Sequence, residues 1–355
     1  MVRIGIVGLG FMGLTHFRAA RGLYGGEVAA VCSRSPEKRG GDLRGILGNF
    51  GEPGGRENFS DLRAYAEFDA ILNDDEIDLI DICLPSELHR DATIGALRAG
   101  KHVLVEKPIA VTIEDAEHMV RVAREQRKLL LVAHVLPYFP EFAYVLQAVR
   151  KGGYGDLIGG HLKRIISRPD WRADTNGSAQ DAGPGIDLHV HDTHFVHLLC
   201  GRPDSVSSSG RLRDGKRADY LATTYHYDSH PDLCLTSASG AVSQPGRAFC
   251  HGFEIYLEEA TVLYEAATLE GQQQISSPLT VLTDDGKVQR PDLGSQSPGN
   301  AFQNELQAAV DSVASGIAAP ELEGGRAADA LRLCIAEIEA ARTRSPISMD
   351  RFAVP

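Results

Sequence analysis

The sequence lacks three features that would each point to a particular class of protein. It has no run of lysines or arginines and a formal net charge of −12, which argue against nucleic acid and anionic membranes as partners. It has no apolar stretch near the ~20 residues that a membrane-spanning helix needs. Its 6 cysteines are scattered without a Cys-x-x-Cys pair, which predicts reduced thiols in a cytoplasmic protein.

The chain has the length, and the alternation of strand and helix segments, that are typical of a two-domain α/β protein. Its 355 residues are 43% hydrophobic, enough for two cores. In the first part, apolar runs alternate with helical segments, which predicts βαβ units and a Rossmann domain with a doubly wound parallel sheet. Strands are expected at 2–7, 27–32, 78–84, 102–105 and 129–134. Helices are expected at 15–22, 67–73, 89–99 and 112–126, and a loop with weak helix at 40–58.

After residue 137 the apolar runs follow one another through turns, so we expect two domains, 1–137 and 138–355. The second is predicted to be an α+β domain with a large, open, mostly antiparallel sheet. Its strands are expected at 157–166, 204–212, 220–227, 233–239, 249–257 and 261–264. Helices are expected at 138–151, 186–200, 300–315 and 325–344, of which the last two are also able to pack back on the first domain. Residues 272–298 are polar and rich in Gly and Pro, which predicts a loop.

The open sheet of the second domain predicts self-association. Few helices are available to cover it, so Val, Leu, Tyr and Phe from 220–227 and 249–257 would form an exposed apolar patch. Two such sheets packed face to face would bury the patch with two-fold symmetry. We therefore expect a homodimer or homotetramer formed through the C-terminal sheet.

A G-x-G-x-x-G fingerprint lies between the first strand and the first helix. Its glycines are Gly8, Gly10 and Gly13, with Phe11 and Met12 inside the motif. Gly8 permits the tight turn, Gly10 lets the backbone approach a pyrophosphate, and Gly13 lets the helix pack on the strand. The helix N-terminus then offers free N–H groups to the phosphates. This context predicts a dinucleotide site.

The end of the second strand bears on which dinucleotide is bound. A carboxylate there would bind the ribose hydroxyls of NAD, but the sequence has Ser33 and Arg34, with Lys38 close behind. These residues can neutralise a 2′-phosphate, which favours NADP over NAD. The alternative is that Arg34 only stacks on adenine, as Arg does on aromatic faces.

A second motif, Glu106-Lys107-Pro108, follows the strand at 102–105. It lies at the carboxyl edge of the predicted sheet, where ligands of doubly wound folds bind. Lys107 would present a cation there on a turn that Pro108 makes rigid, and Glu106 is able to pair with a lysine or a ribose hydroxyl. The alternative is a surface turn with a solvated lysine.

These motifs resemble the Gfo/Idh/MocA family of NAD(P)-dependent oxidoreductases. The similarity runs through most of the first 165 residues and resumes near residue 183. It is carried by the fingerprint, by Glu106-Lys107-Pro108, and by a segment after the 78–84 strand that contains Leu84, Pro85 and His89. The resemblance implies that this segment contacts the cofactor. It also implies that Lys107 contacts both the nicotinamide ribose and the substrate hydroxyl.

A third group is rich in histidine. Asp187 and His191 are spaced i, i+4, which places them on one face of the predicted helix; His191 is able to take a proton from a hydroxyl, and Asp187 to orient it. The pair resembles the family's Gly-Gly-x-x-x-Asp-x-x-x-His motif, in which the histidine is the proposed general base. We interpret His189 as structural. Because His194 and His197 lie nearby, a metal site is the alternative interpretation. We predict no metal site, because no H-E-x-x-H motif accompanies the cluster.

Three further residues are candidates for substrate contact. The loop after the 129–134 strand has apolar residues where many relatives have a basic pair, which disfavours an acidic or phosphorylated substrate. Tyr138 in that loop is able to form an aromatic wall for a sugar. Trp171 and Arg172 fall where relatives often contact the nicotinamide end; a packed Trp beside a surface Arg is the alternative.

Taken together, the motifs predict hydride transfer between NAD(P) and a secondary alcohol or ketone of a sugar, inositol or related polyol. Lys107 would polarise the hydroxyl and His191 would accept its proton. One alternative is a glycosidase of the same family that oxidises its substrate transiently. The other is a non-catalytic NAD(P)-binding sensor.

Overall fold

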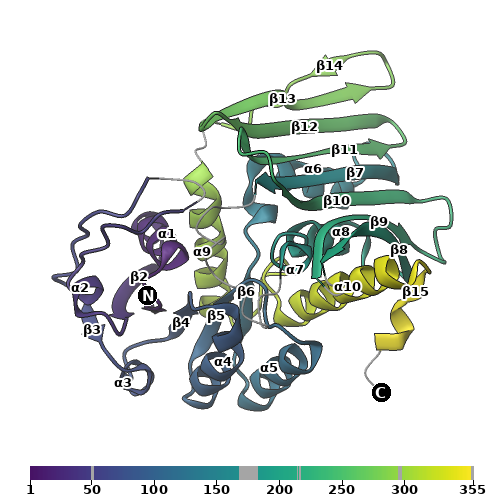
Figure 1. The fold of residues 1–355 in the computed structure, drawn as a ribbon. Coiled ribbons are helices and arrows are strands. Elements are labelled where there is room, and N and C mark those ends of the chain that lie inside the picture. Colours follow the sequence, from purple (N-terminus) through teal and green to yellow (C-terminus); the bar gives the residue numbers. More distant parts are fainter. Residues whose placement is uncertain (49–51, 168–182, 214, 216, 295–297, 353–355) are drawn as a thin grey trace. The chain divides into compact units, whose positions relative to one another are not determined.

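The computed structural model describes residues 1–48, 52–167, 183–213, 215, 217–294 and 298–352. The chain divides into two compact units, whose elements are drawn in Figure 1. Unit 1 comprises residues 1–139 and 295–328, and unit 2 comprises residues 140–294 and 329–355. The late segment 295–328 thus returns to unit 1, an arrangement that the sequence left open for the closing helices. None of the described helices is long and apolar enough to span a membrane.

Unit 1 is built on a parallel sheet of six strands. They are β1 (Val2–Val7), β2 (Gly26–Cys32), β3 (Arg63–Tyr65), β4 (Leu79–Ile82), β5 (His102–Glu106) and β6 (Leu130–Ala133). Their order is β3-β2-β1-β4-β5-β6, and every neighbouring pair is parallel. The order reverses between β1 and β4, which is where doubly wound sheets bind their ligands. The predicted Rossmann fold is confirmed.

Helices connect the strands of unit 1, and one further helix from late in the chain packs on them. They are α1 (Phe11–Ala19), α2 (Pro36–Arg39), α3 (Phe68–Leu72), α4 (His89–Arg98), α5 (Ile113–Gln126) and α9 (Pro298–Ser315), with short turns η1 (Ala20–Gly22), η2 (Ser86–Leu88) and η3 (Leu136–Tyr138). Thr112 caps α5, because its Oγ1 accepts a hydrogen bond of 3.2 Å from the Asp115 N–H. This satisfies one of the free N–H groups of the first turn, and α5 begins where the sequence predicts.

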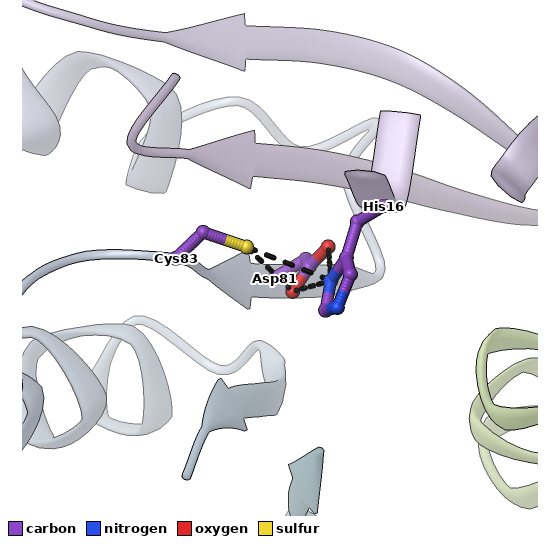
Figure 2. A group of neighbouring side chains, drawn as sticks. All are labelled: His16, Asp81 and Cys83. Carbon is purple, nitrogen blue, oxygen red and sulfur yellow. Dashed lines mark hydrogen bonds and ion pairs between the residues drawn. The ribbon is translucent and has the colours of Figure 1, made fainter. Parts of the chain in front are cut away.

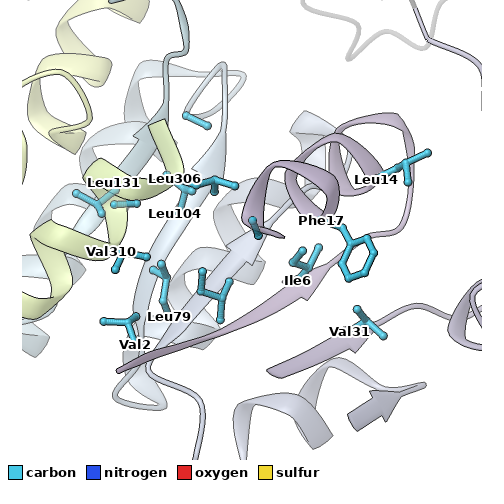
Figure 3. Packing of buried hydrophobic residues seen from close by; sticks show 14 of the residues in the cluster. Val2, Ile6, Leu14, Phe17, Val31, Leu79, Leu104, Leu131, Leu306 and Val310 are labelled. Atoms are coloured by element: carbon cyan, nitrogen blue, oxygen red, sulfur yellow. The ribbon is translucent and has the colours of Figure 1, made fainter. Parts of the chain in front are cut away.

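The hydrophobic core of unit 1 contains residues from both of its segments, 1–139 and 295–328. Leu306 and Val310 of α9 are buried beside Leu79 and Leu104 of the sheet (Figure 3). Val310 also closes over Gly26, where an added Cβ would lie 2.6 Å from Val310 Cγ2. Burial of each such side chain contributes about 1.5–3 kcal/mol, so α9 is an integral part of the Rossmann unit.

Unit 2 is built on a sheet of nine strands. They are β7 (Leu157–Ser167), β8 (Ser205–Arg213), β9 (Arg217–His226), β10 (Cys234–Val242), β11 (Arg247–Leu257), β12 (Ala260–Leu269), β13 (Gln272–Thr283), β14 (Val288–Gln289) and β15 (Ile347–Ser348). Their order is β14-β13-β12-β11-β7-β10-β9-β8-β15. Only β7 and β10 pair in parallel among these described strands. The expected large, mostly antiparallel sheet is confirmed.

The sheet of unit 2 carries its large side chains on the side of the helices. The helices are α6 (Pro140–Lys151), α7 (Pro184–Asp187), α8 (Val190–Cys200) and α10 (Gly324–Thr343), of which α10 starts in unit 1. Phe142 of α6 lies 5.2 Å from Phe195 of α8 and 5.0 Å from Phe253 of β11, measured between ring centroids. Such edge-to-face contacts add to the stabilisation from burial.

This packing corrects the expected apolar patch. The large residues predicted to be exposed on 220–227 and 249–257 are instead mostly buried, among them Leu221, Tyr225, Phe253, Ile255 and Leu257. Residues that alternate with them, such as Ala222, His226 and Glu254, are the exposed ones. Side chains alternate between the two faces of a strand, and the sequence alone did not show which face the helices cover.

Residues 272–298 and 40–58 are among the segments that differ from the sequence predictions. Residues 272–298 contain strands β13 and β14 rather than a loop alone. β13 is held in the sheet by backbone pairing with β12 over residues 260–269. Its first residues are polar and exposed, so the sequence shows no apolar alternation that would predict a strand. Residues 40–58 show an isolated bridge between Asp42 and Arg56 and no helix in their described part.

Candidate active site

The fingerprint glycines build a turn that other residues could not make. Gly8 has φ +97°, a left-handed conformation, and an added Cβ would lie 2.6 Å from the Cys83 carbonyl oxygen. At Gly13 an added Cβ would lie 2.0 Å from the Gly8 carbonyl oxygen. The turn therefore allows α1 to pack closely against the end of β1, as the motif predicts.

The start of α1 fits a dinucleotide phosphate group. Gly10 is the N-cap residue, no side chain caps the helix, and no atom lies within 4 Å of the place where a Gly10 Cβ would be. This nine-residue helix thus begins without a side-chain cap, as an anion site at a helix N-terminus requires. Phe11 and Met12, both partly buried, form the first turn of α1.

The tip after β2 presents Arg34 to solvent. Arg34 is exposed, while Arg39 donates hydrogen bonds of 2.6 and 3.1 Å to the carbonyls of Ser33 and Arg34. Lys38 is partly buried, and its N–H donates to Ser35 Oγ, which caps α2. The backbone of the tip is thus held by residues other than Arg34, whose side chain is available for a ligand.

His89 is a connector within the segment after β4. Its Nδ1 lies 2.9 Å from the Pro108 carbonyl and its Nε2 lies 2.8 Å from the Leu84 carbonyl. Its side chain is buried, and burial lowers its pKa. Leu84 is partly buried and Pro85 is exposed just before η2. His89 therefore ties the segment after β4 to the turn that contains Lys107.

Glu106 ends β5 and is turned inward. It is buried, its Oε2 accepts a hydrogen bond of 3.0 Å from the Lys107 N–H, and its Oε1 lies 3.2 Å from His16 Nε2. We expected this carboxylate to pair with a lysine or a ribose hydroxyl; in the structure both oxygens contact groups of the protein. Lys107 is partly buried, and the Lys107–Pro108 peptide bond is cis.

His16 is a residue of this region that the sequence did not single out. It projects from α1 toward Asp81 of β4 and Cys83 (Figure 2). Its Nδ1 lies 2.9 Å from Asp81 Oδ2 and 3.5 Å from Cys83 Sγ. These three side chains form the one group in the described part of the chain whose ligand atoms lie close enough together for a metal ion. The hydrogen bonds among the three side chains also explain why they lie so close together.

His134 is a second residue that the sequence did not single out. It follows β6, whose Ala133 pairs with Glu106 of β5, so the register brings His134 near Lys107. Burial and then the charge of Lys107 lower its pKa to about 3, so the ring is neutral. Tyr138 lies in η3, partly buried against the core of unit 1. Its expected contact with substrate remains a prediction.

In unit 2, Asp187 and His191 do not share a helix. Asp187 ends α7 and His191 lies in the first turn of α8, with a turn between them. The single helix expected over 186–200 is therefore wrong, as is the argument from i, i+4 spacing. Both side chains are partly buried. The Asp187 N–H donates to the Gly183 carbonyl, so the glycine-containing turn sets the direction of α7.

The other histidines of this segment face the interior. His189 is fully buried, with Nδ1 against Ser239 Oγ and Nε2 against the Glu337 carboxylate. Burial would lower the pKa of His189, but Glu337 raises it above its usual value. His194 and His197 are buried too. Trp171 and Arg172 lie outside the described residues.

Comparison with known proteins finds a family match in the first part of the chain and similar proteins beyond it. Residues 2–134 match a family described as "Oxidoreductase family, NAD-binding Rossmann fold". A 1,5-anhydro-D-fructose reductase from Ensifer adhaerens is 25% identical over 97% of both chains. A glycosyl hydrolase family 109 protein from Shewanella pealeana is 30% identical over 62% of this chain and 47% of its own.

A solved structure supports the fold along the whole chain. A probable dehydrogenase from Thermotoga maritima superposes with a TM-score of 0.78 at 16% identity, covering 99% of this chain and 100% of that one. At this identity the likeness concerns the fold, which includes the second, mostly antiparallel sheet. Residues 2–134 thus match the NAD-binding Rossmann fold of the Gfo/Idh/MocA oxidoreductases, the family that the sequence motifs resemble.

Proposed function

We propose that the protein transfers hydride between NAD(P) and a secondary alcohol or ketone of a sugar, inositol or related polyol. The observation that carries the proposal is the placement of Lys107 directly after β5, in the same sheet whose β1 leads into the fingerprint turn. Both lie at the carboxyl ends of parallel strands, where doubly wound folds bind ligands. The name of the anhydrofructose reductase supports a sugar as substrate.

The residues of this chain have separate tasks in the proposal. When bound, the nicotinamide supplies the hydride chemistry. Lys107 donates a hydrogen bond to the reacting oxygen and stabilises negative charge that develops on it. His191 accepts the proton of the alcohol, and Asp187 orients His191 or a neighbouring hydroxyl. Tyr138, Trp171 and Arg172 are proposed to contact the substrate.

For the cofactor, NADP is favoured over NAD. Ser33 and Arg34 end β2 in place of a carboxylate, and the exposed Arg34 side chain is available for a 2′-phosphate. The fingerprint residues, Lys38, and the segment with Leu84 and Pro85 complete the proposed binding surface. His89 acts on that surface through the two carbonyls that it contacts.

A glycosidase that oxidises its substrate transiently is the second candidate. The 30% identity to a glycosyl hydrolase family 109 protein favours it. It differs in the balance of the reaction, because product forms without net change in the cofactor. A non-catalytic sensor is the third, and it predicts dinucleotide binding with no turnover of either kind.

One assay series separates these candidates. Purified protein is incubated with a panel of sugars, inositols and glycosides, each with NAD and with NADP, while cofactor absorbance and released sugar are followed. Stoichiometric reduction of NADP by a polyol supports the proposal. Sugar release without net cofactor change favours the glycosidase. Dinucleotide binding without either product favours the sensor, and no dinucleotide binding overturns all three.

We also propose a cytoplasmic homo-oligomer. The 6 cysteines are free thiols, which suits a reducing compartment. Ile158, Ile275, Leu282 and Val288 of the C-terminal sheet are exposed, and contact with a second copy would cover such residues. Light scattering at micromolar concentration tests this, because a mass of 38.3 kDa would be that of a monomer.

A further inference from the structure

We propose that His16 is a positioning residue for Lys107: it joins the fingerprint helix α1 to Glu106 and thereby fixes the backbone from which Lys107 projects. The inference rests on the proposed function in one respect, that Lys107 contacts the reacting oxygen. His16 itself is fully buried and reaches no solvent, so we assign it no contact with substrate.

The geometry shows His16 between two carboxylates. Its Nδ1 lies 3.1 and 2.9 Å from the two oxygens of Asp81, and its Nε2 lies 3.2 Å from Glu106 Oε1. Asp81 is 1% exposed and Glu106 is 6% exposed. A neutral imidazole carries one N–H and would turn a lone pair toward one of the carboxylates. An imidazolium carries an N–H on each nitrogen, so it hydrogen-bonds to Asp81 and forms an ion pair with Glu106.

The charges around His16 favour the imidazolium. The ionisable groups that face it are Asp81 of β4, Cys83 just after β4, Glu106 of β5 and Glu305 of α9. Burial alone would lower the pKa of His16, but the charge of Asp81, together with Cys83, raises it well above its usual value. A cation between the buried side chains of Asp81 and Glu106 compensates their negative charge, and an uncompensated buried charge is strongly destabilising.

Glu305 adds a neutral neighbour. Its Oε2 lies 3.9 Å from His16 Nε2, and its side chain is fully buried. Burial, and then the nearby carboxylates of Glu106 and Asp81, raise its pKa, against the opposing effect of His16. Because a protonated Glu305 is neutral, the positive charge of His16 compensates only the carboxylates of Asp81 and Glu106.

The link then continues from Glu106 to Lys107. The first oxygen of Glu106 is directed at His16, and the second accepts the Lys107 N–H at 3.0 Å. The carboxylate thus bridges the ring and the Lys107 backbone. On the other side of the turn, His89 contacts the Pro108 carbonyl at 2.9 Å. The turn around Lys107 is held from both sides by buried histidines.

The position of His16 also ties this turn to the cofactor side of the fold. His16 lies three residues after Gly13, whose close approach to Gly8 brings α1 onto the sheet. The same helix therefore offers its N-terminus to a dinucleotide and its second turn to Glu106. We infer that His16 keeps the fingerprint and Lys107 in a fixed relation within unit 1.

The test compares His16→Gln with Glu106→Gln and the double variant. His102→Gln is the matched control, because His102 starts β5 at the end opposite Glu106 and contacts the Leu129 N–H. Dinucleotide dissociation constants are measured by NADPH fluorescence, and kcat and KM on the substrate found in the panel. The melting temperature reports folding.

We expect His16→Gln to lower kcat by about tenfold or more, since small misplacements of a catalytic group have effects of up to about 10². Its dinucleotide affinity and substrate KM should change less than about threefold. The double variant should lose no more than Glu106→Gln alone, because His16 acts through Glu106. Unchanged kcat in His16→Gln, or additive losses in the double variant, would overturn the inference.

A second measurement tests the inference even if the variants do not fold or the proposed function is wrong. In ¹⁵N-histidine NMR spectra of the wild type at pH 8, the His16 ring, assigned as the signals that disappear in His16→Gln, should carry protons on both nitrogens, and these signals should move in Glu106→Gln. If the assigned His16 ring is neutral, the inference is wrong whatever the substrate. If the wild type binds no dinucleotide, the proposed function fails while the protonated ring is still observed.

Discussion

Arg164 of β7 and Asp192 of α8 form a buried ion pair, with Arg164 Nη2 3.0 Å from Asp192 Oδ1 and Nε 3.2 Å from both oxygens. The guanidinium also lies 5.9 Å from the ring centroid of Phe249. Asp192 directly follows His191, so the pair fixes the start of α8 on the sheet and with it the residue proposed to accept a proton.

Removal of one partner should be costly. Asp192→Asn leaves Arg164 buried without a counter-charge, and we expect a loss of about 3–5 kcal/mol in the free energy of unfolding. Urea denaturation measures it. Glu339→Gln, which breaks an exposed pair with Arg342, is the control and should lose less than about 1 kcal/mol. Equal losses in the two variants would mean that the buried pair does not anchor α8.

Lys107 is expected to be indispensable for turnover. Lys107→Ala removes the donor to the reacting oxygen, and kcat should fall by about 10²-fold or more. The circular dichroism spectrum should remain unchanged, because the side chain is only partly buried. Lys151→Ala, at the exposed end of α6, is the matched control with normal turnover expected. Near-normal kcat in Lys107→Ala would remove this residue from the mechanism.

Arg34 should discriminate between the two cofactors. Arg34→Ala removes a charge-assisted contact to the 2′-phosphate, and NADP affinity should weaken by about 1.5–3 kcal/mol, while NAD affinity changes little. Titrations followed by cofactor fluorescence measure both constants. Arg98→Ala, exposed at the end of α4, serves as control. An equal loss for NAD and NADP would show that Arg34 stacks on adenine, and tighter wild-type binding of NAD would reverse the assigned preference.

The parts of the fold that could be predicted are those whose signal is local. The strand that contains Leu79 and Ile82 is buried on both faces, so it is an apolar run interrupted only by Asp81, as expected for a strand of a parallel sheet. The fingerprint turn is similarly local, because Gly8 and Gly13 meet across five residues. Such features need no knowledge of what packs against them.

The parts that could not be predicted depend on partners distant in the chain. His16 contacts Asp81, which is 65 residues away, and nothing near His16 in the sequence indicates a carboxylate. The break between α7 and α8 places His189 between Ser239 and Glu337, contacts that a helical periodicity cannot foresee. The orientation of β9 and β11 likewise depends on helices elsewhere in the chain.

The buried acid Glu305 gives a prediction about stability and pH. Burial raises the pKa of Glu305 well above its usual value of 4.5, so the folded protein keeps a proton that the unfolded chain loses above that pH. The stability that this proton contributes is complete below about pH 4 and is lost progressively as the pH rises. Glu305→Gln keeps the size of the side chain and cannot ionise. Its stability relative to wild type should therefore increase with pH.

The free energy of unfolding of Glu305→Gln, relative to that of wild type, should increase by at most about 1.4 kcal/mol per pH unit. This increase is expected between pH 5 and the pKa of Glu305 in the folded state. Urea unfolding of both proteins at pH 4, 5, 6, 7 and 8 measures it. Glu125→Gln, at an exposed position of α5, should show no such trend. Because His16 opposes the shift at Glu305, the trend also reports the charge within the buried cluster. A difference between Glu305→Gln and wild type that stays constant from pH 4 to 8 would mean that Glu305 is ionised in the folded protein.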